Sequence, residues 1–179
     1  MLWQKDHPMP EVPSAPAAYS IEAVPSERAD RARALVDIDG ATTDAEWRHY
    51  SKSVVPDGLF AAIEQASSDL VGTIGAIDNP AASRFYFPGG GQLGYLVVAP
   101  KHRCRGIGSS LIATAVRRLR EGGYRDIYLG VQAWRLPAIR AYLSVGFQPF
   151  IHDPNLTRRW RAVFAALERE PHESEWLRP

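Results

Sequence analysis

A chain of 179 residues has room for one domain with a sizeable core and little room for a second. Hydrophobic residues make up 45% and charged residues 23%, which is the composition of an ordinary soluble globular protein. A net charge of +1 argues against general nucleic-acid binding, and no apolar run approaches the length of a membrane span. The single cysteine cannot form an internal disulfide, and the first residues lack the apolar core of a secretory signal. We therefore expect a cytoplasmic protein with neither a membrane nor a nucleic-acid partner.

The charge is unevenly distributed along the chain. Residues 101–140 hold nine Lys and Arg against two acids, so this segment carries +7 and the remainder −6. A local positive field on a nearly neutral protein suits a small polyanionic ligand better than a long nucleic acid. The basic residues 117, 118 and 120 fit a solvated helix face, but that explanation does not easily cover three basic residues at 101, 103 and 105.

The chain begins with a proline-rich stretch. Residues 1–18 contain four prolines and are expected to form an extended or loosely attached arm. Residues 19–24 alternate apolar and polar side chains and predict a short strand. Ser26 is a candidate cap for a helix that runs to about Ile38.

A capping-box pattern then opens a second short helix. Thr43 and Glu46 have the required spacing, and the helix is expected to continue through Tyr50. Residues 59–65 and 70–77 predict two antiparallel strands joined by a turn. Residues 79–91 predict a loop, because they contain Asn-Pro and Pro-Gly-Gly-Gly.

The clearest helix of the sequence follows a short apolar strand. Tyr95–Val98 is a continuous apolar run, which predicts a buried central strand. The helix ends at Gly122-Gly123 and carries one apolar stripe at helical spacing, formed by Gly108, Leu111, Ile112, Ala115, Val116 and Leu119.

The last third of the chain alternates strands and helices. Residues 126–131 predict a strand, and Pro137 opens a helix that ends at Gly146. Another short strand is expected over 147–151. An amphipathic helix over about 157–169 then precedes a tail, residues 171–179. Residues 19–170 are thus expected to form a single domain.

The turn Arg103–Gly108 joins the apolar strand to the clearest helix. Its glycines allow close backbone approach to a ligand, and the free N–H groups of the first helical turn form an anion site. A pyrophosphate is the natural occupant. A dinucleotide-binding fingerprint would need a third glycine where Leu111 stands, and a Walker A loop would need a lysine where Ser109 stands.

Three segments in this order resemble the GNAT N-acetyltransferase superfamily: Leu96-Val-Val-Ala-Pro100, Arg103-Cys-Arg-Gly-Ile-Gly108 and Ala138-Ile-Arg-Ala-Tyr-Leu-Ser-Val-Gly-Phe147. The resemblance implies an α/β fold of mixed α+β type. Its central sheet would be mostly antiparallel, with a splayed parallel strand pair and flanking helices. The motifs cover residues 95–147, and the topology covers about 19–151.

The resemblance also implies acetyl-CoA, or another acyl-CoA, as the cofactor. In this family the pantetheine arm hydrogen-bonds the splayed end of the fourth strand, and the amides of the glycine turn hold the pyrophosphate. The cofactor-binding residues are therefore expected to be Leu96, Val97, Val98, Arg103, Cys104, Arg105, Gly106, Ile107, Gly108, Ser109 and Arg135.

Tyr142 resembles the general acid of the family. Amide formation from a thioester needs removal of a proton from the amine, donors for the oxyanion and a proton for the departing sulfur. A tyrosine with a pKa of about 10 is protonated at neutral pH and can supply that last proton. A backbone N–H around Val97 or Val98 is the candidate oxyanion donor. The structural alternative for Tyr142 is a core aromatic residue on an inward helix face.

The sequence departs from the family at two positions. Arg135 stands where members often carry an asparagine, and it is placed to reach a phosphate, a substrate carboxylate or only solvent. Gly130 stands where some members carry a glutamate base. The candidates for the base are Glu46, His49, Asp78 or a water chain to a backbone carbonyl, and Glu46 already has a role in the capping box.

The C-terminus also differs, because the family commonly ends with a strand hairpin rather than a helix. That helix is expected to cover the sheet or to mediate dimerisation, so the protein is expected to be a monomer or a homodimer. His102 and Cys104 lack partners at catalytic spacing, and no metal site is expected.

Two functions remain open on the sequence. One is an acetyltransferase acting on a primary amine of a small molecule, peptide or protein, with an acceptor groove near Trp47, Tyr50, residues 79–91 and Trp134. The other is a non-catalytic acyl-CoA sensor or protein-interaction module on the same fold.

Overall fold

The computed structural model describes residues 1–4, 6–11, 15–25, 29–37 and 43–179. These residues form one six-stranded sheet with the order β1-β6-β5-β4-β3-β2, in which only β5 and β6 are parallel. The strands are β1 (Leu2–Trp3), β2 (Tyr19–Ala23), β3 (Val54–Glu64), β4 (Leu70–Asp78), β5 (Gly91–Val98) and β6 (Ile127–Tyr128). The predicted fold class, a mostly antiparallel sheet with one parallel pair and flanking helices, is confirmed.

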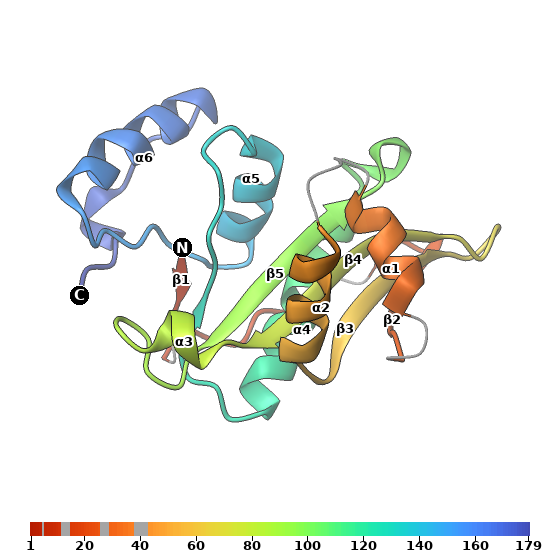
Figure 1. The fold of residues 1–179 in the computed structure, drawn as a ribbon. Helices are drawn as coiled ribbons and strands as arrows, with labels where there is room; N and C mark the ends of the chain where they lie inside the picture. Colours follow the sequence, from red (N-terminus) through yellow and green to blue (C-terminus); the bar gives the residue numbers. More distant parts are fainter. Residues whose placement is uncertain (5, 12–14, 26–28, 38–42) are drawn as a thin grey trace.

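Helices cover both faces of this sheet (Figure 1). They are α1 (Ala29–Val36), α2 (Asp44–Ser53), α3 (Pro80–Ser83), α4 (Ile107–Glu121), α5 (Leu136–Ser144) and α6 (Pro154–Ala166). α1 and α2 pack on one face, around Leu59 and Ile77, and α4 packs on the opposite face with Leu111 and Leu119 fully buried. No helix in the described parts of the chain is long and apolar enough to cross a membrane.

Two locally encoded helices agree with the sequence. The capping box of α2 is complete, because Thr43 Oγ1 accepts from the Glu46 amide and the Glu46 carboxylate accepts from the Thr43 amide. α4 carries the predicted apolar stripe and ends at Gly122. The expected cap Ser26 and the expected end Ile38 of the first helix lie outside the described residues. Within residues 79–91, a short helix, α3, interrupts the expected loop.

The expectation of a loosely attached arm is wrong for its first residues. Leu2 and Trp3 form β1, which pairs with β6, and the Trp3 side chain is fully buried. The Leu2 amide donates to Gln148 O and the Gln148 amide donates to Leu2 O, each over 2.9 Å. β1 therefore lies between β6 and Gln148, a position that hydrophobic patterning in a proline-rich stretch does not reveal.

The strand expected over 147–151 is replaced by isolated bridges. Gln148 bridges Leu2, and Phe150 bridges Leu177. The strand expected over 126–131 is likewise limited to Ile127–Tyr128, since the Leu129 amide donates to Met1 O instead of to β5. The predicted C-terminal helix exists as α6, and it buries Trp160, Val163 and Phe164 in a cluster with Ile139 and Trp176.

Candidate functional site

Strands β5 and β6 begin as a parallel pair and then diverge, which leaves a V-shaped opening between them. The two strands pair only at Gly91 with Ile127 and at Gln92 with Tyr128. Beyond Gln92, the edge of β5 that faces away from β4 has no partner strand within the described structure. Leu96, Val97 and Val98 lie on this open part and are half-buried, which corrects the expectation of a fully buried strand. The free edge offers backbone donors and acceptors to an extended ligand.

A bulge marks the middle of the open strand. Between the pairs Thr73–Val97 and Gly75–Gly94, β5 uses one residue more than β4, and Tyr95 takes a positive φ of 53°. Bulges re-aim side chains and disturb strand pairing, and they are frequent next to active sites. Residue patterns along β5 did not predict this bulge, because it depends on the pairing of β5 with β4.

The glycine turn lies at the open end of β5. Gly106 caps α4 with a φ of 82°, and Cys104 also has a positive φ of 59°. Within the described residues, the backbone N–H groups of 104–109 donate to no protein acceptor, and the first paired amide is that of Ser110, to Gly106 O. Successive free N–H groups at a helix N-terminus form an anion-binding concavity.

The predicted arginines fasten this turn. Arg103 Nε donates to Val98 O over 2.9 Å, and Arg105 donates through Nη1 to the Tyr19 hydroxyl and through Nη2 to Lys101 O. Both guanidinium groups therefore remain at the turn, and each also donates a hydrogen bond to a backbone carbonyl, Val98 O or Lys101 O. Ser109 Oγ lies 3.2 Å from Ser144 Oγ and links the first turn of α4 to α5. Ile107 is buried and anchors the turn to the core.

Tyr142 lies on the inward face of α5. It is buried, with its ring edge-on to Phe147 at 5.7 Å between centroids. Burial raises the pKa of the Tyr142 phenol, and the nearby charge of Arg135 lowers it by less. The hydroxyl makes no hydrogen bond to any residue that the structure describes.

A family model described as the acetyltransferase (GNAT) family matches residues 22–147, which is more than half of the chain. The chain belongs to this family. The GNAT chain is 32% identical over 101 residues to N-acetyltransferase 8B of Rattus norvegicus, covering 55% of this chain and 44% of that protein. It is 32% identical over 98 residues to N-acetyltransferase 8 of Mus musculus, covering 54% of this chain and 40% of that protein. The match thus spans less than half the length of these curated relatives.

Solved structures with low sequence identity share the GNAT fold. A GCN5-related N-acetyltransferase from Sphaerobacter thermophilus aligns with a TM-score of 0.61 at 21% identity, over 81% of this chain and 45% of that chain. An IAA acetyltransferase from Bacillus cereus aligns with a TM-score of 0.59 at 19% identity, over 74% and 78% of the two chains. These likenesses support the fold assignment alone.

The three residues considered as candidate bases, Glu46, Asp78 and His49, have different surroundings in the GNAT fold. The Glu46 carboxylate is held by the Thr43 amide and hydroxyl, which lower its pKa. Asp78 pairs with Gly91 in the β4–β5 ladder, at the closed end of the V, and its charge acts on Tyr124 and Tyr128. His49 is exposed on α2. Burial, and then the nearby charge of Glu46, raise the pKa of the Tyr95 phenol on the open part of β5, so Glu46 lies near this part while Thr43 engages its carboxylate.

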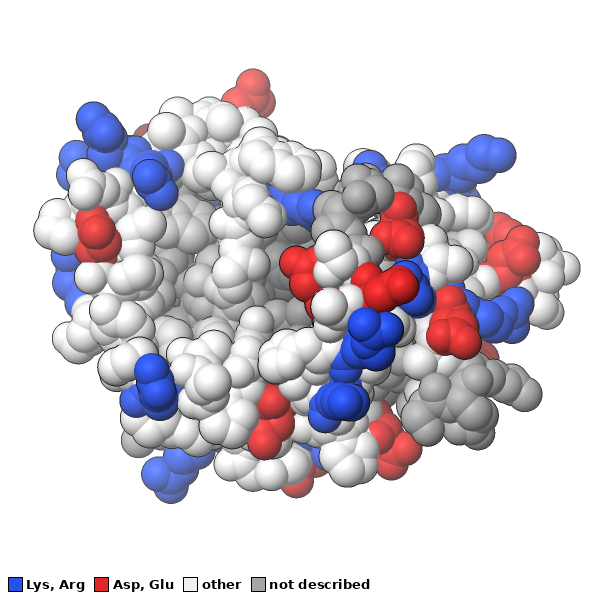
Figure 2. Space-filling view, viewed as in Figure 1, with Lys and Arg blue, Asp and Glu red and all other residues white. Residues whose placement is uncertain are grey.

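Aromatic side chains gather beside the bulge on the α2 face. Tyr50 and Tyr95 lie 4.3 Å apart between ring centroids, and Trp47 contacts both. Trp134 is 70% exposed, with the Arg135 guanidinium 4.6 Å from its ring centre. On the same side of the molecule, Lys, Arg, Asp and Glu gather over α1 and α2, while the surface over β5 and α5 carries few charges (Figure 2).

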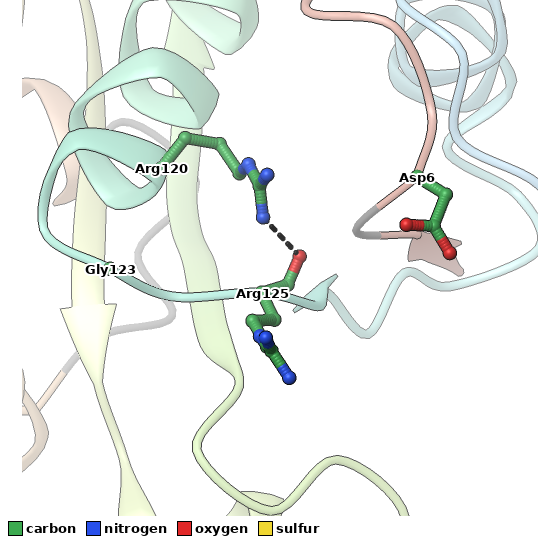
Figure 3. A pocket seen from close by; sticks show the side chains of 4 residues that line it. All are labelled: Asp6, Arg120, Gly123 and Arg125. Atoms are coloured by element: carbon green, nitrogen blue, oxygen red, sulfur yellow. Dashed lines mark hydrogen bonds between the residues drawn. The ribbon is translucent and has the colours of Figure 1, made fainter.

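A cavity of about 310 Å³ lies at the other end of α4 and is lined by Asp6, Arg120, Gly123 and Arg125 (Figure 3). Arg120 Nη1 donates there to Tyr124 O and Arg125 O, and its guanidinium lies 5.6 Å from the Trp3 ring centre. The glycine turn is about 20 Å away along the helix, at 1.5 Å per residue. Arg120 therefore holds the backbone that follows the C-terminus of α4 and lies outside the candidate site.

No group of three His, Cys, Asp or Glu in the described residues could hold a metal ion.

Proposed function

We propose that this GNAT protein is an acetyl-CoA-dependent N-acetyltransferase that moves the acyl group to a primary amine by direct attack on the thioester. The observation that carries the proposal is the row of free amides over residues 104–109, at the open end of an unpaired strand edge. A diphosphate and an extended amide-bearing arm are the two parts of coenzyme A that such a site would recognise.

The chain's residues fit this ligand. The amides of Cys104, Gly106 and Gly108 would hold the diphosphate, and a Cβ added at Gly106 would meet open space, so that backbone is accessible. The open edge over Leu96–Val98 would pair with the pantetheine arm. Arg135 is assigned to the same ligand through its position near Tyr142. When bound, acetyl-CoA or another acyl-CoA supplies an acyl group activated as a thioester.

Two groups of the protein would assist the transfer. A backbone N–H at Val97 or Val98 would donate to the developing oxyanion, and Tyr142 would donate its proton to the departing sulfur. A tyrosine of ordinary pKa is protonated at neutral pH, and burial raises the pKa of the Tyr142 phenol further. We assign removal of the amine proton to water at the open face, because Thr43 engages Glu46 and Asp78 lies at the closed end.

The acceptor would approach from the α2 face. The aromatic side chains of Trp47, Tyr95 and Trp134 suit an amine carried on a small molecule, a peptide or a protein. The names of the relatives, N-acetyltransferase 8B among them, support transfer to nitrogen. We further propose a cytoplasmic location and a monomeric or homodimeric state, the latter through α6.

A non-catalytic acyl-CoA sensor is the second candidate, and the engagement of the Glu46 carboxylate by Thr43 favours it. Calorimetry with acetyl-CoA and release of free thiol with a panel of primary amines separate the two. Binding with thiol release supports the enzyme, and binding without release on any amine supports the sensor. Absence of binding overturns both.

A further inference from the structure

A chain of polar contacts ties the glycine turn to two strands far away in sequence. Tyr19 opens β2 and is buried, and its hydroxyl lies 2.9 Å from Arg105 Nη1 and 3.1 Å from His102 Nδ1. His102 Nδ1 is in turn 3.8 Å from a carboxylate oxygen of Glu64, the residue that pairs with Tyr19 in the β2–β3 ladder. Residue spacing did not reveal a partner for His102, because Tyr19 lies 83 residues away.

The direction of the hydrogen bond from Arg105 follows from its donor. A guanidinium can only donate, so the Tyr19 hydroxyl accepts from Arg105. The hydroxyl donates to His102 Nδ1 when that nitrogen carries no proton, and a protonated Nδ1 donates to the hydroxyl or to Glu64 instead. Arg105 uses its other arm on Lys101 O, 3.1 Å away. The hydroxyl is thus the junction that connects Arg105 to His102 and Glu64.

The junction fixes a backbone conformation that the turn would not keep by itself. Cys104 has a φ of 59°, which is unfavourable for a residue with a side chain. Arg103 on one side is fastened to Val98 O, and Arg105 on the other side is fastened to Tyr19 and Lys101. These attachments hold residues 104–106, whose backbone amides donate to no acceptor among the described residues.

We propose that Tyr19 and His102 are positioning residues for the diphosphate of the cofactor. They act through Arg105 on the shape of the turn and make no contact with the ligand. This inference rests on the proposed binding of coenzyme A at residues 103–108. It assigns a role in cofactor binding to β2, an element outside the motifs that define the site.

The test compares Tyr19→Phe with Tyr124→Phe, which removes a hydroxyl near Asp78 at the far end of α4. Tyr19→Phe keeps the buried ring and removes only the junction. We expect its Kd for CoA, measured by calorimetry, to rise about fivefold, which corresponds to the loss of one net hydrogen bond. The KM for acetyl-CoA should rise in proportion with kcat unchanged, and Tyr124→Phe should match the unmodified protein.

A donor without a diphosphate provides the decisive readout. With S-acetylpantetheine, the turn has nothing to bind, so Tyr19→Phe and the unmodified protein should have equal kcat/KM. An equal penalty on both donors, or no penalty on CoA, overturns the positioning role while leaving the proposed function intact. If the unmodified protein binds no CoA, the proposed function fails, and this inference fails with it.

A second pair of variants covers the case in which Tyr19→Phe does not fold. His102→Ala removes the hydrogen-bond partner of the Tyr19 hydroxyl, whereas His102→Gln replaces it with an amide that can accept from the hydroxyl or donate to it. We expect His102→Ala to weaken CoA binding as Tyr19→Phe does, and His102→Gln to recover most of the affinity. Equal affinities for the two His102 variants contradict the proposed junction.

Discussion

The hydroxyl of Tyr50 occupies the space above Gly75 where the β-carbon of any other residue would stand. Gly75 pairs with Gly94 on β5, and a Cβ on Gly94 would lie 3.4 Å from the Tyr50 ring. Two facing glycines thus form a notch in the sheet that receives the Tyr50 ring from α2. The notch brings α2 close to the bulge at Tyr95, where the acceptor is proposed to approach.

Gly75→Ala should destabilise the protein by about 1–3 kcal/mol, because the added methyl group meets a buried ring that cannot move away. Chemical denaturation measures the change. Gly130→Ala is the matched control, since a Cβ at Gly130 meets open space. Equal stability of the two variants would show that the Tyr50 ring does not fill the notch.

Tyr50→Phe should raise stability by about 1 kcal/mol, because the Tyr50 hydroxyl is buried without a hydrogen-bond partner in the described structure. Burial also raises the pKa of this phenol. Thermal unfolding should show a higher Tm for the variant. A lower Tm would indicate that the hydroxyl has a partner in solution, such as an ordered water.

Tyr142→Phe should lower kcat by at least about tenfold, the scale of lost general-acid catalysis, with little change in Tm. Because burial raises the pKa of Tyr142 above its ordinary value of 10, the phenol holds its proton to higher pH. The kcat of the unmodified protein should therefore not decline through loss of this proton below pH 10. Unchanged turnover in the variant removes Tyr142 from the mechanism.

Glu46→Ala should lower the Tm at neutral pH. Hydrogen bonds from the Thr43 amide and then from its hydroxyl lower the folded-state pKa of Glu46 below its usual 4.5. Such a group stabilises the fold above pH 4.5, and the contribution is lost as the pH falls through the lower folded-state value. The Tm difference from the unmodified protein should shrink below pH 4.5. Glu121→Ala, at the end of α4, is the control, and a constant difference at all pH values contradicts the role of the carboxylate.

Trp3→Ala should destabilise the protein by about 3–5 kcal/mol, because the Trp3 side chain is fully buried between β6 and the main core. Met9→Ala, in an exposed part of the same segment, should be close to neutral. Denaturation midpoints compare the two. A small effect of Trp3→Ala would indicate that β1 is only loosely attached to the sheet.

Helices that are specified by residues close together in the chain were predictable from the sequence. The stripe of α4 and the capping box of α2 depend on residues within a few positions of each other, and both helices appear where expected. β1 depends on Leu2 meeting Tyr128 and Gln148, contacts that no local pattern encodes. The 147–151 segment has the pattern of a strand, but β1 lies between it and β6.

The candidate site likewise has features that follow from nearby residues and features that arise only when distant strands pair. The glycine turn was visible from spacing and charge, and the structure adds how Arg103 and Arg105 fasten it. The bulge at Tyr95 and the contact of Tyr19 with Arg105 arise only when strands pair, so residue spacing could not predict them. Glu46 and Asp78 were candidates by position, and the structure adds that Thr43 engages Glu46 and that Asp78 lies at the closed end of the V.

The free edge of β5 has a consequence for engineering. Peptide groups are the same whatever side chain they carry, so recognition along Leu96–Val98 should tolerate exchanges of one apolar residue for another. The exposed Trp134 and Phe85 belong to loops that the sheet ladder does not constrain. On the proposed function, a library that varies these two positions should change which amines are accepted while the donor remains the same.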